Sequence, residues 1–223
     1  MNVAIIGNSF LGAVVKAAAQ DPSAADGLAL TFGAAGGVNF KTIDVVDGRF
    51  VNLRSDGTTT FDRVDAYDAV VIYGLFPYPA EIVRMHRKLI GAGYSQAVSD
   101  AAIDDYLAAS DAWVVFRRIR AATAAPVWIL SGNERSDVGL VTAADRARGA
   151  DMIARFTDGI YVPPPGALVT EDGTADQRFY KGSFDILGRL ATDEATQRKW
   201  DLHHFNIDGG RVMLDAIVRR LRA

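Results

Sequence analysis

Two short stretches near opposite ends of the sequence hold residue types that can act together in nucleophilic catalysis. Gly7-Asn8-Ser9 follows an apolar run, and Asp201 and His204 stand three positions apart close to the C-terminus. A serine hydroxyl becomes a nucleophile when a histidine takes its proton, and a carboxylate can hold that histidine in the productive tautomer. On a turn or helix-like stretch, a three-residue spacing brings both side chains to one side. Ser9, Asp201 and His204 therefore form a candidate catalytic triad.

The nucleophile and the base of this triad each have an alternative interpretation. Ser9 precedes a predicted helix, and capping the N-terminus of a helix is a common role for serine. His203 is a second candidate base, although the two-residue spacing from Asp201 normally turns the two side chains apart. The presence of a serine turn and an Asp-x-x-His stretch in one chain favours Ser9 as the nucleophile and His204 as the base.

The N-terminal turn can also be compared with the dinucleotide-binding fingerprint Gly-x-Gly-x-x-Gly. Gly7, Ser9 and Gly12 occupy its three fixed positions, so serine replaces the glycine that lets the backbone approach a pyrophosphate. The second predicted strand runs into Phe32 and Gly33 without the carboxylate that would bind a ribose hydroxyl. The sequence therefore favours a nucleophile over a nucleotide-binding turn.

The elements that must position these residues alternate between strand and helix. Apolar runs predict buried strands at 3–6, 28–32, 69–73 and 127–130, with a last short strand before the three prolines at 163–165. Helical periodicity follows at about 11–20, 80–89, 99–122, 142–156 and 209–223. This alternation predicts a single α/β domain over residues 1–223, a three-layer sandwich with a doubly wound, mainly parallel sheet. In such sheets ligands gather at the carboxyl ends of the strands, where Ser9 would lie.

One segment departs from this alternation. Residues 41–64 alternate apolar and polar side chains around Asp47-Gly48, a dipeptide typical of hairpin turns. We expect a β-hairpin insertion on the surface of the domain. Residues 163–183 are expected to form a long loop with a proline-rich start.

Composition excludes several classes of function. The 223 residues carry a net charge of −3, three histidines and no cysteine, which excludes disulfides, thiolate nucleophiles and cysteine-ligated metals. Neither a metal site nor a nucleic-acid partner is indicated. No apolar stretch approaches the roughly 20 residues that span a bilayer, and no leader precedes the first strand, so we expect a cytoplasmic protein without membrane contact. The oligomeric state is not indicated.

Together the two ends of the chain resemble the SGNH (GDSL-type) hydrolase family. That family places its nucleophile in a Gly-Asp-Ser or Gly-Asn-Ser turn after the first strand, matched here by Gly7-Asn8-Ser9. Its Asp-x-x-His, followed by asparagine and glycine, is matched by Asp201 to His204, Asn206 and Gly209. The resemblance covers the whole chain. It implies a flavodoxin-like fold and a serine esterase that forms an acyl-enzyme on a small ester or an acetylated carbohydrate, without cofactor or metal.

The resemblance also implies an oxyanion hole. The backbone N–H of Ser9 is one donor, and the family's glycine after the second strand matches Gly33, Gly36 or Gly37, of which we favour Gly36. The family's third donor is the asparagine of a Gly-x-Asn-Asp stretch, but Phe76 stands at that position here. Asn133, after the strand at 127–130, is a candidate replacement, although it can equally serve only to make a turn.

Four further residues are candidates for contact with substrate: Asn8, Tyr73, Gly74 and Phe76. The absence of the third donor leaves an alternative function open, namely a catalytically weak module of the same fold that binds a glycan or a protein partner. Retention of a serine, an aspartate and a histidine at the matching positions favours the esterase.

Overall fold

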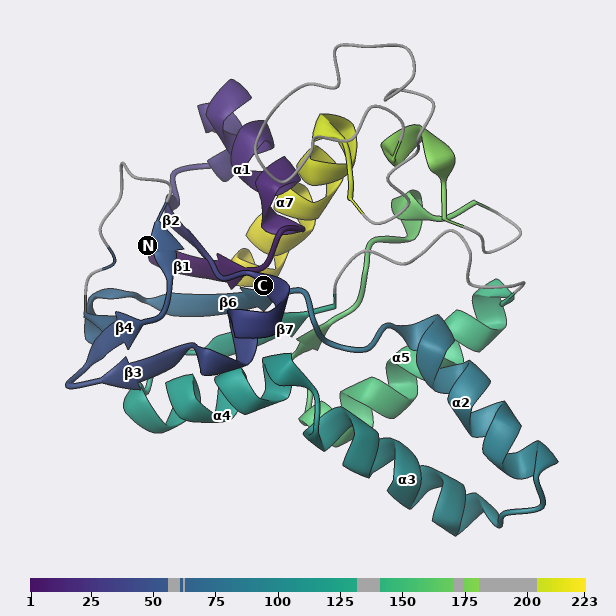
Figure 1. The fold of residues 1–223 in the computed structure, drawn as a ribbon. Coiled ribbons are helices and arrows are strands. Elements are labelled where there is room, and N and C mark those ends of the chain that lie inside the picture. The colour runs from purple at the N-terminus through teal and green to yellow at the C-terminus, as the bar shows by residue number, and fades with distance from the viewer. Residues whose placement is uncertain (56–60, 62, 132–140, 171–174, 181–203) are drawn as a thin grey trace.

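A six-stranded sheet forms the centre of the molecule (Figure 1). The computed structural model describes residues 1–55, 61, 63–131, 141–170, 175–180 and 204–223. The strands lie in the order β5 (Arg54–Ser55), β2 (Ala29–Ala34), β1 (Asn2–Gly7), β6 (Ala69–Tyr73), β7 (Val127–Leu130) and β8 (Tyr161–Val162). All neighbouring strands are parallel except β5, which pairs with β2 in the antiparallel sense. The predicted α/β fold with a mainly parallel sheet is confirmed.

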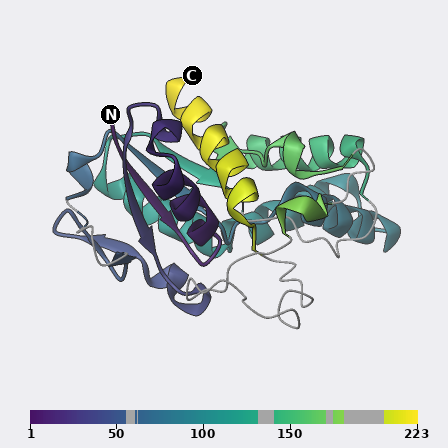
Figure 2. The ribbon, with the colours of Figure 1, turned by 90° about the horizontal axis from the view of Figure 1, so that it is seen from above.

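Helices cover both faces of the sheet (Figures 1 and 2). Side chains alternate along a strand, so Val3 and Ile5 point to one face while Ala4 and Ile6 point to the other. The first face packs against α1 (Leu11–Gln20) and α7 (Ile207–Arg222). The second face packs against α4 (Asp111–Ala122) and α5 (Ala143–Thr157). The helices α2 (Pro79–Gly91) and α3 (Gln96–Ala108) pack in turn against α5 and α4 and extend the same hydrophobic core. None of the helices in these ranges is long and apolar enough to cross a lipid bilayer.

The register of the parallel strands brings five carboxyl ends into one row. Gly7 at the end of β1 pairs with Ala34 of β2 on one side and Tyr73 of β6 on the other. Tyr73 pairs in turn with Leu130, and Leu130 pairs with Val162. The segments that follow these strands therefore emerge together at one edge, where α/β sheets gather their ligands.

Two expectations about local structure differ in outcome. The hairpin within 41–64 is confirmed as β3 (Asp44–Val46) and β4 (Arg49–Val51), joined by Asp47 and Gly48 with φ of 51° and 73°. The prediction of one continuous helix over 99–122 is wrong, because this segment forms two helices, α3 and α4. Ser110 separates them: its hydroxyl donates to the Leu107 carbonyl at 2.7 Å and accepts from the Trp113 N–H at 3.4 Å, which caps the start of α4.

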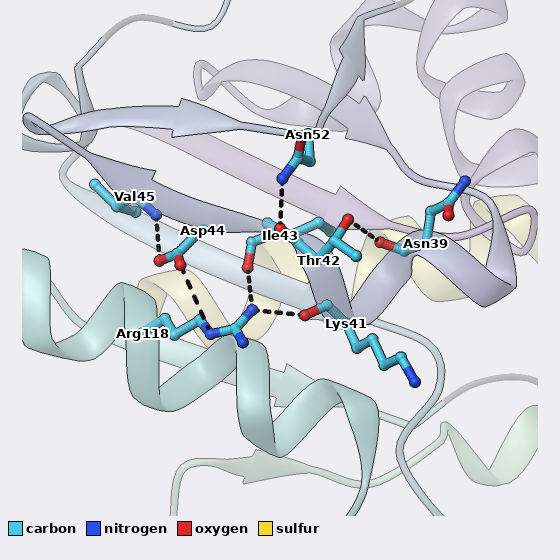
Figure 3. A network of polar contacts seen from close by, with 8 residues as sticks. All are labelled: Asn39, Lys41, Thr42, Ile43, Asp44, Val45, Asn52 and Arg118. Atoms are coloured by element: carbon cyan, nitrogen blue, oxygen red, sulfur yellow. Dashed lines mark hydrogen bonds and ion pairs between the residues drawn. The ribbon is translucent and has the colours of Figure 1, made fainter.

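Arg118 of α4 fixes the segment that leads from the sheet edge into the hairpin (Figure 3). Its guanidinium donates to the carbonyls of Lys41 at 2.6 Å and Ile43 at 3.0 Å, and lies 3.8 Å from the Asp44 carboxylate. Lys41 belongs to η2 (Gly37–Thr42), a 3₁₀ helix that starts directly after Gly36. Arg118 thus ties α4 to the end of the chain segment that carries Gly36.

Replacing Arg118 by alanine should lower the free energy of unfolding by roughly 1–2 kcal/mol, because two charge-assisted hydrogen bonds are lost from a half-exposed side chain. Urea unfolding measures this difference. Arg117, exposed on the same helix, provides the matched control, and its replacement by alanine should change stability by less than about 0.5 kcal/mol. Equal losses for the two variants would show that Arg118 does not act through these contacts.

Candidate functional site

Ser9 and His204 are in direct contact at the carboxyl edge of the sheet. Ser9 lies between the end of β1 and the start of α1, and His204 lies just before α7. The His204 Nε2 atom is 2.8 Å from the Ser9 Oγ atom, although the residues are 195 positions apart in the chain. The sequence-based expectation that these side chains lie within hydrogen-bond reach is confirmed. A histidine nitrogen at this distance can take the serine proton in one step.

The turn that presents Ser9 is tight and built around Gly7 and Asn8. The Cβ of any larger residue at Gly7 would lie 2.9 Å from the Tyr73 carbonyl oxygen and 3.0 Å from the Leu11 Cβ, so the first residue of the turn must be glycine. Asn8 is only 4% exposed, and its side-chain oxygen accepts from the Phe10 N–H at 3.1 Å. These contacts fix the backbone on both sides of Ser9.

The crossing of α1 and α7 brings His204 to this turn. The two helices lie side by side in both views (Figures 1 and 2). Gly210 sits directly against the Ala13 carbonyl, and a Cβ at Gly210 would overlap it. A glycine in the first turns of α7 therefore lets the two backbones approach closely, and this approach brings His204, three residues before α7, to Ser9, two residues before α1.

The segment around His204 is held by its neighbours. Asn206 caps α7 by accepting from the Gly209 N–H at 3.0 Å, and its backbone N–H donates to the Phe179 carbonyl at 2.7 Å. The Phe205 ring packs 4.8 Å from the Tyr180 ring, and the Phe10 ring lies 5.3 Å from the imidazole of His204. The candidate base is thus oriented by aromatic packing on one side and by the helix cap on the other.

Gly36 lies at the same edge as Ser9. The Ala35 N–H donates to the Gly7 carbonyl at 3.0 Å, which continues the β1–β2 pairing to the residue before Gly36. Gly36 is exposed, and a Cβ on it would meet no atom within 4 Å. Its placement beside an open part of the sheet edge is compatible with the role implied by the family resemblance, which stays a prediction.

The segment after β6 adopts a conformation that few residues accept. Gly74 has φ of 97° and the following Leu75 has φ of 53°. A Cβ at Gly74 would lie 2.5 Å from the Asn8 side-chain oxygen, so the absence of a side chain lets Asn8 occupy its buried place. The turn after β6 and the turn after β1 are therefore shaped against each other.

Replacing Gly74 by alanine should destabilise the fold by about 1–3 kcal/mol from the positive φ alone, and the overlap with Asn8 adds to this. Because Asn8 precedes the candidate nucleophile, ester hydrolysis should fall as well. Gly27 is the matched control, since its φ is 77° but a Cβ on it would meet no atom within 4 Å. A thermal melt measures the stability of the Gly74→Ala and Gly27→Ala variants, and an esterase assay measures their activity. Equal losses of stability and activity in the two variants would contradict the role given to Asn8.

Tyr73 and Phe76 lie in the hydrophobic core. Tyr73 is 0% exposed and packs with the α1 and α7 layer, while Phe76 is 3% exposed with its ring 5.8 Å from that of Tyr161. Burial, with a smaller contribution from the nearby Tyr180, raises the pKa of Tyr73 well above its usual value. Its hydroxyl therefore stays neutral. Contact of substrate with Asn8, Tyr73, Gly74 or Phe76 stays a prediction.

Three sequence-predicted residues, Asp201, His203 and Asn133, lie outside the described residues. Among the residues whose positions are described, no group of three or more histidine, aspartate or glutamate side chains could hold a metal ion. Sequence reasoning missed Phe10, Phe205 and Gly210 as residues that hold the site. The signal for the two phenylalanines was their position directly next to Ser9 and His204, whereas Gly210 had no signal beyond its place at the start of a helix.

Comparisons with known proteins give limited similarity. No family model and no curated protein sequence matches this chain. Among solved structures, the lipase Lip_vut3 from a goat rumen metagenome is 11% identical with a TM-score of 0.43, over 100% of this chain and 96% of its own. A DUF4886 family protein from Bacteroides uniformis ATCC 8492 is 14% identical with a TM-score of 0.38, over 98% of this chain and 81% of its own. At such TM-scores the likeness carries no conclusion about function.

Proposed function

We propose that this protein is a serine esterase of the SGNH hydrolase type. The observation that carries the proposal is the 2.8 Å contact between the Ser9 Oγ and the His204 Nε2. These side chains come from opposite ends of the chain and meet at the carboxyl edge of a parallel sheet. A contact that serves only packing or capping does not require an imidazole nitrogen aimed at a serine hydroxyl.

The proposed reaction passes through an acyl-enzyme. The Ser9 Oγ attacks the acyl carbon of the ester while its proton passes to the His204 Nε2. The bond to the alcohol then breaks, and His204 gives the proton to the departing alkoxide. Water repeats the sequence, giving a proton to His204 as it attacks the acyl carbon, and Ser9 is restored as the acid leaves. Asp201 is proposed to orient His204 and to stabilise its cation. No cofactor or metal takes part.

Stabilisation of the oxyanion is proposed to come mainly from backbone groups. The N–H of Ser9 precedes α1, whose N-terminus carries partial positive charge, and the N–H of Gly36 is the second proposed donor. Phe76 has no donor group and is buried, so the family's asparagine has no counterpart at this position. A third hydrogen-bond donor to the oxyanion would therefore have to come from another part of the chain, and Asn133 is the candidate.

Replacing Asn133 by alanine tests this third donor. If Asn133 binds the oxyanion, kcat should fall by about 10²–10³-fold with little change in KM, because the contact forms mainly in the transition state. Steady-state kinetics on one activated ester measure both constants. An unchanged kcat would show a hole with two donors and would remove Asn133 from the mechanism.

A second candidate function is a weakly catalytic module that binds a glycan or a protein partner. The observation that favours it is the buried phenylalanine at position 76 in place of an amide donor. Hydrolysis of p-nitrophenyl acetate and of acetylated sugars by the purified protein separates the two functions. Turnover that disappears in Ser9→Ala supports the esterase, whereas tight glycan binding without turnover in the wild-type protein supports the module.

A further inference from the structure

The residue that caps α7, Asn206, makes a contact that capping does not require. It lies two residues after His204, and its partly buried side chain uses both ends of its amide group. The Oδ1 atom accepts from the Gly209 N–H at 3.0 Å, which is the cap. The Nδ2 atom donates to the Arg178 carbonyl at 2.7 Å, 28 positions earlier in the chain. One side chain therefore joins the start of α7 to a separate segment of the fold.

The backbone of Asn206 doubles this link. Its N–H donates to the Phe179 carbonyl at 2.7 Å, so one residue bonds two consecutive carbonyls, those of Arg178 and Phe179. Both carbonyls belong to η5 (Gln177–Phe179), a single turn of 3₁₀ helix. Two hydrogen bonds from one residue to the same turn fix the orientation of that residue as well as its position.

The turn that Asn206 bonds is itself held in place. The Asp176 N–H donates to the Leu168 carbonyl at 2.9 Å, and the Asp176 side chain caps η5 by accepting from the Arg178 N–H at 3.1 Å. Leu168, Phe179 and Tyr180 are buried in the same part of the core as the inner side of α7. Because η5 is anchored in the core, its carbonyls give Asn206 a fixed support.

The residue between His204 and Asn206 leaves this stretch of chain little freedom. Phe205 is 3% exposed, and a Cβ on Gly209 would lie 2.7 Å from the Phe205 Cβ. The absence of a side chain at Gly209 thus lets Phe205 fold onto the first turn of α7. With its neighbour packed in this way, the position of Asn206 determines that of His204, whose Nε2 lies 2.8 Å from the Ser9 Oγ.

We infer that Asn206 is a positioning residue for the reaction: by bonding η5 through its side-chain amide, it holds the His204 imidazole at hydrogen-bond distance from the Ser9 hydroxyl. The inference rests on the proposed esterase function and adds a residue that does not touch the substrate. Proton transfer needs this distance, and a displacement of about 1 Å can lower the rate by roughly 10²-fold. The cap alone does not call for an amide, because a carboxylate caps a helix equally well but cannot donate to the Arg178 carbonyl.

Asn206→Asp separates the bond to η5 from the cap. The carboxylate still accepts from the Gly209 N–H, whereas the donor to the Arg178 carbonyl is lost. We expect kcat for p-nitrophenyl acetate to fall about ten-fold or more, with KM changed by less than about two-fold. Asn206→Ser keeps a capping oxygen and has no amide, so it should show the same loss. If one variant folds poorly in a thermal melt, the other decides the result.

Ser95 provides the matched control for loss of a cap. Its side chain caps α3 by accepting from the Val98 N–H at 3.3 Å, and it is exposed. Ser95→Ala should lower Tm by about 2–4 °C and leave kcat and KM as in the wild-type protein. An unchanged kcat in both Asn206→Asp and Asn206→Ser would reduce Asn206 to a cap of the same kind and overturn the inference, while leaving the esterase intact.

A second background shows whether the effect passes through His204. The rate at which Ser9 reacts with a fluorophosphonate probe is measured for Asn206→Asp, for His204→Ala and for the double variant. Asn206→Asp alone should react about ten-fold more slowly than the wild-type protein, but the double variant should match His204→Ala, because no imidazole is left to position. A further slowing in the double variant would show a general structural effect and overturn the inference. A wild-type protein that neither hydrolyses the ester nor reacts with the probe would overturn the proposed function itself.

Discussion

Replacing Ser9 by alanine is expected to lower kcat for ester hydrolysis by about 10⁴–10⁶-fold and to leave the folded structure intact. The hydroxyl is the atom that forms the acyl-enzyme, so without it only binding and the backbone donors contribute to catalysis. The side chain lies on a partly exposed turn, and its backbone N–H remains in the variant. Kinetics with an activated ester and a thermal melt measure the two properties separately.

Ser131 provides the matched control for Ser9. It is a serine just beyond the end of β7, at the same edge of the sheet, but it is buried with its hydroxyl 3.1 Å from that of Tyr161. Ser131→Ala should lower the free energy of unfolding by about 1 kcal/mol and keep the activity. Loss of activity in Ser131→Ala but not in Ser9→Ala would contradict the assignment of the nucleophile.

The second large effect concerns the base and the residue that orients it. His204→Ala should lower kcat as much as Ser9→Ala, and the double variant should be no worse than either, because residues of one catalytic unit are not additive. Asp201→Asn should lower kcat by up to about 10⁴-fold, since an amide holds the histidine in the wrong tautomer. Single-turnover and steady-state kinetics on the same ester measure these losses.

His203 is the built-in control for this prediction. It is the neighbour of the proposed base and shares its chemistry, so His203→Ala should have a small effect. A severe loss in His203→Ala together with a mild loss in His204→Ala would show that the base is His203. The contact between the Nε2 of His204 and the Oγ of Ser9 favours the opposite outcome.

The regular parts of the fold follow from local sequence patterns. The run from Val3 to Ile6 is apolar at every position because β1 is central and buried on both faces. The dipeptide Asp47-Gly48 accepts the positive φ values that a two-residue hairpin turn requires, which is why this hairpin could be predicted. In each case the neighbouring residues alone determine the structure.

Features that depend on distant parts of the chain could not be predicted in this way. β5 has two residues and exists because it pairs with β2, and a segment so short carries no periodicity of its own. The break at Ser110 is set by a capping hydroxyl within a continuous helical pattern. The fit of Gly210 against Ala13 is set by the crossing of two helices far apart in the sequence. The contact between Ser9 and His204 was expected from the serine turn and the Asp-x-x-His stretch, whereas the close packing of helices that creates it was not.

Labelling with a fluorophosphonate probe tests the central claim most directly, because such a probe forms a covalent bond only with an activated serine. The wild-type protein should react stoichiometrically, and the labelled peptide identified by mass spectrometry should carry the probe on Ser9. His204→Ala should react at least about 10²-fold more slowly, since its serine has lost the base. A wild-type protein that does not react, or one whose label lies on another residue, would contradict the proposal that Ser9 and His204 form a catalytic pair.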